Sequence, residues 1–170
     1  MNVELYLVRL SANADTIAGL AGGVSDSQAR WKPSPDEWSI LEVLCHLYDE
    51  EREDFRTRVR LTLQNPAEPW PPIDPAGWVT QRGYNQREFG PSLEAFLRER
   101  RESLKWLSSL QNPNWGSAHE HPRIGRMTAG DALAAWAAHD HLHIRQLNQL
   151  HWQYLALDTP PLSLDYAGGW

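Results

Sequence analysis

The stretch Trp136-Ala-Ala-His-Asp-His-Leu-His-Ile-Arg-Gln-Leu147 places three histidines at alternate positions of a segment with helical character. His139 and His143 are four residues apart, so on an α-helix they lie one above the other on the same face. His141 falls on roughly the opposite side. The face of the first two also carries apolar residues at three- and four-residue steps, namely Ala132, Trp136, Leu147 and Leu150. The pattern therefore predicts a pair of inward-pointing histidines on one long helix.

A third histidine lies far from this pair in a second segment with helical character, Leu44-Cys-His-Leu-Tyr-Asp-Glu-Glu51. His46 is bracketed by an apolar stripe, which consists of Ile40, Val43, Leu44 and Leu47. Burial of uncharged imidazoles without partners costs free energy, and a shared metal ion offsets that cost. Three histidines from two helices, with coordination left open, are what a catalytic metal site needs. We therefore expect His46, His139 and His143 to bind one metal ion.

Other interpretations of these histidines are also consistent with the sequence. A buried pair can instead be satisfied by ordinary hydrogen bonds within the core. A zinc protease helix of the His-Glu-x-x-His type is disfavoured, because Asp140 stands where the glutamate base is required and its side chain is shorter. Three imidazoles suit zinc, nickel, copper and iron alike, so the residues do not select one metal.

Polar side chains near the histidines are candidates for supporting roles. Asp49 and Glu50 follow His46 at i+3 and i+4, so either carboxylate is a candidate general base beside a metal-bound water. The alternative is that both lie on the solvated side of a surface helix. Gln146 follows His143 by three residues and is a candidate for orienting a ligand.

The amphipathic segments predict the fold class. Four segments have helical periodicity: 3–21, 39 to about 63, 92 to about 107, and 128 to about 154. Capping boxes open the second and the fourth, at Ser39-Ile-Leu-Glu42 and Thr128-Ala-Gly-Asp131. The connections at 65–80 and 111–127 are long, and no strand-type alternation is visible. We expect an all-α protein, a four-helix bundle with long crossover connections.

Length and charge set broad limits on function. The chain has 170 residues, which is typical of one domain, here 1–170. Its formal net charge of −6 argues against a nucleic-acid partner, because phosphate binding requires concentrated Lys and Arg. The basic run at 98–101 is interleaved with acids, so we expect it to be a solvated helix face. His119 and His121 lie on a connection that can cover a site, although ordinary loop histidines are the preferred interpretation.

Cysteine usage and the amino terminus indicate the compartment. Cys45 is the only cysteine, which excludes an intramolecular disulfide and fits a reducing environment. On a helix Cys45 is turned about 100° from His46, so we expect a small buried residue. Met1–Leu10 lacks the pattern of a signal peptide, and no apolar stretch approaches the ~18 residues of a membrane helix. We expect a cytoplasmic protein with no membrane partner.

Taken together, these motifs resemble the DinB/YfiT-like superfamily of metal-binding four-helix bundles. The matching pieces are Trp38-Ser-Ile40, His46-Leu-Tyr-Asp-Glu50 and His139-Asp-His-Leu-His143-Ile-Arg-Gln146, and their order extends over nearly the whole chain. The resemblance implies a divalent metal, often nickel or zinc, held by His46, His139 and His143. It also implies that homodimers are common.

The resemblance further implies a class of activity. Characterised members include transferases and isomerases that use low-molecular-weight thiols such as bacillithiol or mycothiol. We therefore expect a metal-dependent thiol S-transferase or hydrolase that acts on a small-molecule substrate. Several members read His-Arg-Gly-Gln where this chain reads His143-Ile-Arg-Gln146, a departure that bears on the thiol-transferase subgroup and leaves the metal ligands intact. The alternative is a non-catalytic metal-binding or interaction module. A DNA-damage role is suggested only by the family name, and the acidic balance argues against direct DNA contact.

Overall fold

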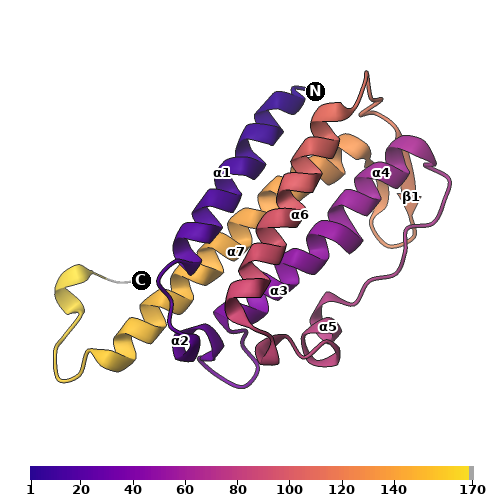
Figure 1. Ribbon diagram of the computed structural model, residues 1–170. Helices are drawn as coiled ribbons and strands as arrows, with labels where there is room; N and C mark the ends of the chain where they lie inside the picture. Colours follow the sequence, from indigo (N-terminus) through magenta and orange to yellow (C-terminus); the bar gives the residue numbers. More distant parts are fainter. Residues whose placement is uncertain (169–170) are drawn as a thin grey trace.

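The computed structural model describes residues 1–168, and its long helices lie side by side as a bundle (Figure 1). The four helical segments are α1 (Val3–Ala21), the continuous pair α3 (Ile40–Asp49) and α4 (Arg56–Gln64), α6 (Phe89–Ser109) and α7 (Ala129–Asp158). Helix α1 packs against α6 and α7, while α3 packs against α6 and α4 against α7. The predicted all-α four-helix bundle is confirmed. Among residues 1–168, no helix is both long and apolar enough to cross a membrane.

Side-chain caps determine where two of these helices begin. The Ser39 hydroxyl accepts a hydrogen bond from the Glu42 N–H, and the Glu42 carboxylate accepts one from the Ser39 N–H. Thr128 and Asp131 form the same reciprocal pair at the start of α7. Both predicted capping boxes are therefore present. Helix α7 continues to Asp158, about one turn beyond the predicted end.

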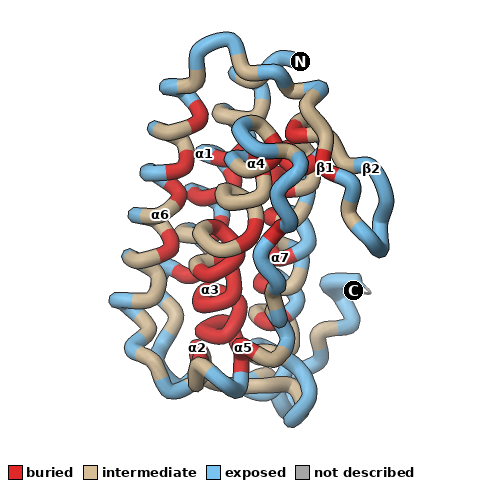
Figure 2. Tube along the Cα trace, turned by 90° about the vertical axis from the view of Figure 1, so that its right-hand side faces the viewer, coloured by how far each residue is buried: buried red, intermediate tan, exposed pale blue. Residues whose placement is uncertain are grey.

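The second helical segment changes its geometry in the middle. Residues Glu50–Phe55 form a π-helical turn, η1, between α3 and α4. A π turn is wider than an α turn and alters which side chains face the core. Glu50, Glu51 and Asp54 of this turn are all buried. Helix α3 is itself buried on nearly all sides, as its colour in Figure 2 shows.

The long connections contain regular structure that the sequence analysis did not predict. The first contains α5 (Pro75–Gln81), where the Asp74 side chain accepts a hydrogen bond from the Gly77 N–H. The second contains an antiparallel hairpin of β1 (Ala118–His121) and β2 (Gly125–Thr128), a short addition to the helical bundle that no sequence pattern indicated. Strands of four residues offer too little alternation to be recognised. The remaining short elements are α2 (Asp26–Arg30), η2 (Tyr84–Gln86) and η3 (Asp165–Ala167).

A buried ion network separates two apolar clusters along the bundle. One cluster includes Ala14, Ile17, Leu44, Leu47, Phe96 and Leu147, and the other includes Leu10, Val59, Leu107, Leu133 and Trp136. Arg100 lies between them and is 1% exposed. It forms paired hydrogen bonds with Glu51, both at 2.9 Å, and with Asp140, both at 2.8 Å. The network thereby joins α6 to η1 and α7.

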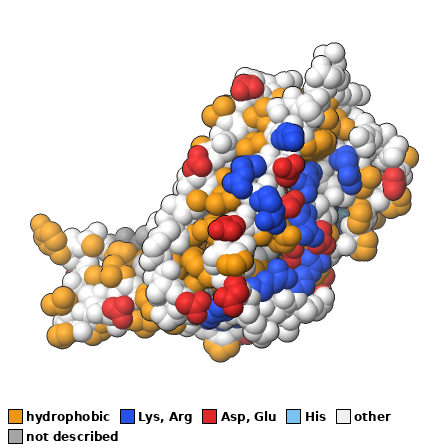
Figure 3. Space-filling view, in the orientation of Figure 1, with side chains coloured by type: hydrophobic (Ala, Val, Ile, Leu, Met, Phe, Trp, Pro, Cys, Tyr) orange, Lys and Arg blue, Asp and Glu red, His pale blue; other side chains and the backbone are white. Residues whose placement is uncertain are grey.

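Arg100 corrects the expectation that the basic run at 98–101 is a solvated face. Arg98 and Arg101 are exposed as expected, whereas Arg100 is turned into the core by the helical period. On the face shown in Figure 3, Lys and Arg side chains are interspersed with Asp and Glu, which agrees with the mixed charges of the sequence.

Removal of Arg100 should destabilise the bundle strongly. The Arg100→Met substitution leaves the carboxylates of Glu51 and Asp140 buried without a cation, so we expect the free energy of unfolding to fall by about 3–5 kcal/mol. Urea denaturation measures this change. The control is Arg101→Met, an exposed neighbour whose effect should stay within about 0.5 kcal/mol. Equal stability of the two variants would contradict the role assigned to the network.

Candidate metal centre

The three predicted histidines converge inside the bundle. Ring centroids are 4.5 Å apart for His139 and His143, 4.7 Å for His46 and His143, and 5.4 Å for His46 and His139. One ring nitrogen of each lies within 4.8 Å of the other two. The Nε2 atoms of His139 and His143 are 3.2 Å apart, a separation that suits two nitrogens each about 2.0–2.1 Å from one ion. The geometry thus brings together the side chains that the sequence singled out.

Burial leaves this cluster short of hydrogen-bond partners. His46 is 4% exposed, and its Nδ1 atom has no hydrogen-bond partner among the described residues. His143 is 8% exposed, and His139 is partly buried. A buried polar atom without a partner costs free energy, and a cation bound by the cluster would offset that cost. The donor set therefore fits a metal ion.

The surroundings keep all three imidazoles uncharged near neutral pH. Burial lowers the pKa of His46 to about 2, and the other two histidines add to this shift. Burial also lowers the pKa of His139 to about 4 and that of His143 below its usual value. Neutral imidazole is the form that binds a metal ion.

Neighbouring side chains fix the orientation of the rings. The Gln146 Oε1 atom lies 2.9 Å from Nδ1 of His143, so Nδ1–H donates to it and the Nε2 lone pair faces His139. The Trp38 ring is parallel to His143, with centroids 6.3 Å apart, and lies 4.8 Å from His46. Phe55 lies 5.0 Å from His139. Gln146 therefore occupies the orienting position considered for it, while the contact from Phe55 was not anticipated.

The two candidate bases differ in their partners. Asp49 is buried and accepts a hydrogen bond from the Tyr84 hydroxyl at 2.5 Å, and it also pairs with Arg82 at 2.7 Å. Burial raises the pKa of Tyr84, and the hydrogen bond to Asp49 raises it further. Arg82 and Tyr84 lie between the predicted connection at 65–80 and the helix predicted from 92, where no motif marked them. The Asp49 carboxylate is thus engaged by groups outside the histidine cluster.

Glu50 lies one helical turn beyond His46 and has a freer carboxyl group. It is 4% exposed, and its Oε1 atom has no hydrogen-bond partner among residues 1–168. Burial raises the pKa of Glu50 to about 9, and the neighbouring carboxyl of Asp54 adds to the rise. Burial also raises the pKa of Asp54, which pairs with Arg58. The expected alternative of a solvated face for Asp49 and Glu50 was wrong, because both are in the interior.

Two further features adjoin the cluster. A cavity of about 330 Å³ is lined by Trp38 and Gln146, both of which contact His143, together with Asp36, Glu37, Gln149, Leu150 and Gln153. Cys45 is 1% exposed, which confirms the expected small buried residue, and burial raises the pKa of its thiol. The cavity is therefore separated from His143 by Trp38 and Gln146, and Cys45 does not belong to the cluster.

Comparison with known proteins agrees with this architecture. YfiT from Bacillus subtilis, described as a probable metal-dependent hydrolase with an unusual four-helix bundle topology, superposes with a TM-score of 0.78. The two chains are 19% identical, and the match covers 89% of this chain and 87% of YfiT, so the likeness shows a shared fold. No curated protein matches. The DinB superfamily model matches residues 9–147, a range that contains all three histidines, and the chain therefore belongs to the DinB superfamily.

Proposed function

We propose that this protein is a metal-dependent hydrolase or thiol S-transferase whose metal ion binds to His46, His139 and His143. The convergence of three neutral imidazoles from two helices, two of them buried and His139 partly buried, carries the proposal. No carboxylate or thiolate of the described residues joins the group, so coordination positions are left for water, thiol or substrate. The description of the similar YfiT structure as a probable metal-dependent hydrolase supports the hydrolytic reaction.

The ion would supply Lewis-acid chemistry, in that a divalent cation lowers the pKa of a bound water or thiol towards neutrality. We propose nickel or zinc, since both accept imidazole nitrogen. The chain itself orients the ligands: Gln146 fixes the ring of His143, and Trp38 and Phe55 exclude water from the side of the rings. A small-molecule substrate would approach from the cavity that Trp38 and Gln146 separate from His143.

We assign the proton-handling role to Glu50 rather than to Asp49. The raised pKa of Glu50 keeps its carboxyl protonated at neutral pH, so the group can donate a proton to a leaving group. Asp49 is the weaker candidate because Arg82 and Tyr84 occupy its carboxylate. From the family resemblance we further propose that the protein is a cytoplasmic homodimer and that it uses a low-molecular-weight thiol.

Turnover should depend on the metal ion bound by the histidine cluster. Zinc- or nickel-loaded protein is expected to hydrolyse p-nitrophenyl acetate, or to conjugate a thiol to monochlorobimane, at a rate proportional to bound metal. His143→Ala should lower that rate by about 100-fold or more, because the activated nucleophile is lost. His141→Ala is the matched control, since His141 is exposed on the same helix and lies outside the cluster. Rates that are unchanged by metal removal in both assays would contradict the proposal.

The raised pKa of the Glu50 carboxyl should make the free energy of unfolding depend on pH. Its pKa is raised from 4.5 to about 9 in the folded chain, so between these values the folded state holds a proton that the unfolded state has released. The contribution of Glu50 to stability is therefore complete below about pH 4.5 and is lost as the pH rises towards 9. The Glu50→Gln side chain cannot ionise. In metal-free protein, the free energy of unfolding of this variant relative to the wild type should therefore rise by on the order of 1 kcal/mol per pH unit between about pH 5 and 8.

The control for this measurement is Glu53→Gln. A hydrogen bond from Arg82 lowers the pKa of Glu53, so Glu53 stays ionised in both states across this pH range. Its difference from the wild type should therefore be constant. Urea denaturation at several pH values gives both curves, and a Glu50→Gln curve parallel to the wild type would refute the assignment.

A further inference from the structure

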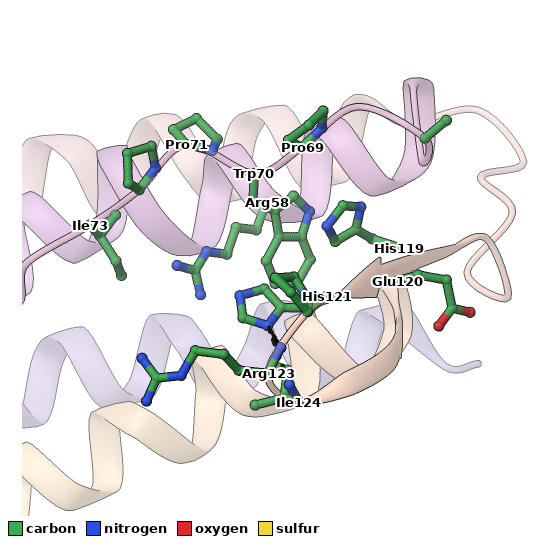
Figure 4. A pocket seen from close by; sticks show the side chains of 13 residues that line it. Arg58, Pro69, Trp70, Pro71, Ile73, His119, Glu120, His121, Arg123 and Ile124 are labelled. Atoms are coloured by element: carbon green, nitrogen blue, oxygen red, sulfur yellow. Dashed lines mark hydrogen bonds between the residues drawn. The ribbon is translucent and has the colours of Figure 1, made fainter.

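A second cavity lies between the β-hairpin and the proline-rich segment that follows α4 (Figure 4). Its volume is about 720 Å³. Arg58 of α4 contributes one wall, and none of the three histidines of the candidate metal centre lines this cavity. The cavity is therefore separate from the candidate metal centre.

Two stacked, largely buried rings form the floor of this cavity. Trp70 is 8% exposed, and its Nε1–H donates a hydrogen bond to the Thr62 hydroxyl. The His119 ring stacks on Trp70 with centroids 4.7 Å apart. Nδ1 of His119 lies 2.9 Å from the Pro66 carbonyl oxygen and donates to it. Because both rings are held by these bonds and are largely buried, they form a fixed floor, and Pro71, Ile73 and Ile124 supply apolar lining beside it.

Cationic and donor groups surround this floor. The Arg58 guanidinium lies 4.8 Å from the Trp70 ring centre and pairs through Nε with Asp54, while its terminal nitrogens make no hydrogen bond to any described residue. Nδ1 of His121 accepts hydrogen bonds from the backbone N–H groups of Arg123 and Ile124, so the proton of the neutral ring is on Nε2. In Figure 4 the guanidinium groups of Arg58 and Arg123 extend to the same side of His121.

Strand alternation directs the carboxylate of Glu120, a lining residue, away from Trp70, so Asp54, the partner of Arg58, is the carboxylate beside these donors. His119 and His121 share one face of β1, and Glu120 points to the other, away from Trp70 (Figure 4). Glu120 is the cross-strand neighbour of Arg126 in the register of the hairpin. A chain with a net charge of −6 thus presents arginine and histidine donors beside an aromatic floor. This arrangement gives His119 and His121 a place in a built cavity, in contrast to the ordinary loop histidines that we expected.

We propose that this cavity binds a small planar organic carboxylate. The anionic group would lie among Arg58, His121 and Arg123, which together offer charge-assisted hydrogen bonds. The planar part would lie against the apolar side chains of Pro71, Ile73 and Ile124 that line the cavity beside Trp70. The site is independent of the function proposed for the histidine cluster, since it shares no lining residue with that cluster.

Calorimetric titration with 2-naphthoate tests the proposal, with the isosteric 2-naphthamide as the neutral probe. We expect 2-naphthoate to bind about tenfold more tightly than the amide, because only the carboxylate makes charge-assisted bonds. Arg123→Gln should weaken 2-naphthoate binding about fivefold or more. Arg126→Gln is the matched control: it removes the same charge from the opposite face of the hairpin and should change the affinity less than about twofold.

Two further measurements separate this site from the metal centre and from the fold of the hairpin. Metal-stripped protein should retain the affinity for 2-naphthoate. His121→Asn keeps an acceptor near the Nδ1 position for the turn and removes the Nε2 donor, so it should also weaken binding while the melting temperature is maintained. The proposal is overturned by loss of binding on metal removal, by equal effects of Arg123→Gln and Arg126→Gln, or by no measurable binding up to the solubility limit.

Discussion

The buried guanidinium of Arg100 is the contact on which the arrangement of the bundle depends. It donates to Glu51 in η1, to Asp140 in α7 and to the Leu10 carbonyl in α1, so one side chain from α6 connects all four helical segments. Burial alone would lower the pKa of Arg100, but Glu51 and Asp140 raise it. An ion group of this kind tolerates few alternative registers, because a shift of one helix would leave a charge unpaired in the core.

This register has a direct consequence for the candidate metal centre. Asp140 immediately precedes the turn of α7 that carries His143 and immediately follows His139, so fixing Asp140 also fixes both histidines. Glu51 lies five residues beyond His46 and is tied to the same guanidinium. The network thus sets α3 and α7 opposite each other at the height where the three imidazoles meet. Asn13 donates a further hydrogen bond to Asp140, and Trp136 donates one to Glu51.

Much of this architecture could be predicted from the sequence, and the exceptions have identifiable causes. The capping boxes and apolar stripes predicted the main helices, and the four-residue spacing of His139 and His143 predicted a shared face. The partners of Arg100 could not be predicted, because its carboxylates come from segments 49 and 40 residues away. The partners of Asp49 were missed for the same reason. The π turn also brings adjacent glutamates into the interior, which ordinary helical periodicity does not anticipate.

The central claim is that His46, His139 and His143 hold one metal ion. Its most direct test is metal content by mass spectrometry on untagged protein purified without chelator or metal resin. The account predicts about one divalent ion per chain, lost in His46→Ala, His139→Ala and His143→Ala and retained in His141→Ala. Protein that contains no metal and takes up none when nickel or zinc is added, or variants of the three histidines that retain it, would contradict the claim.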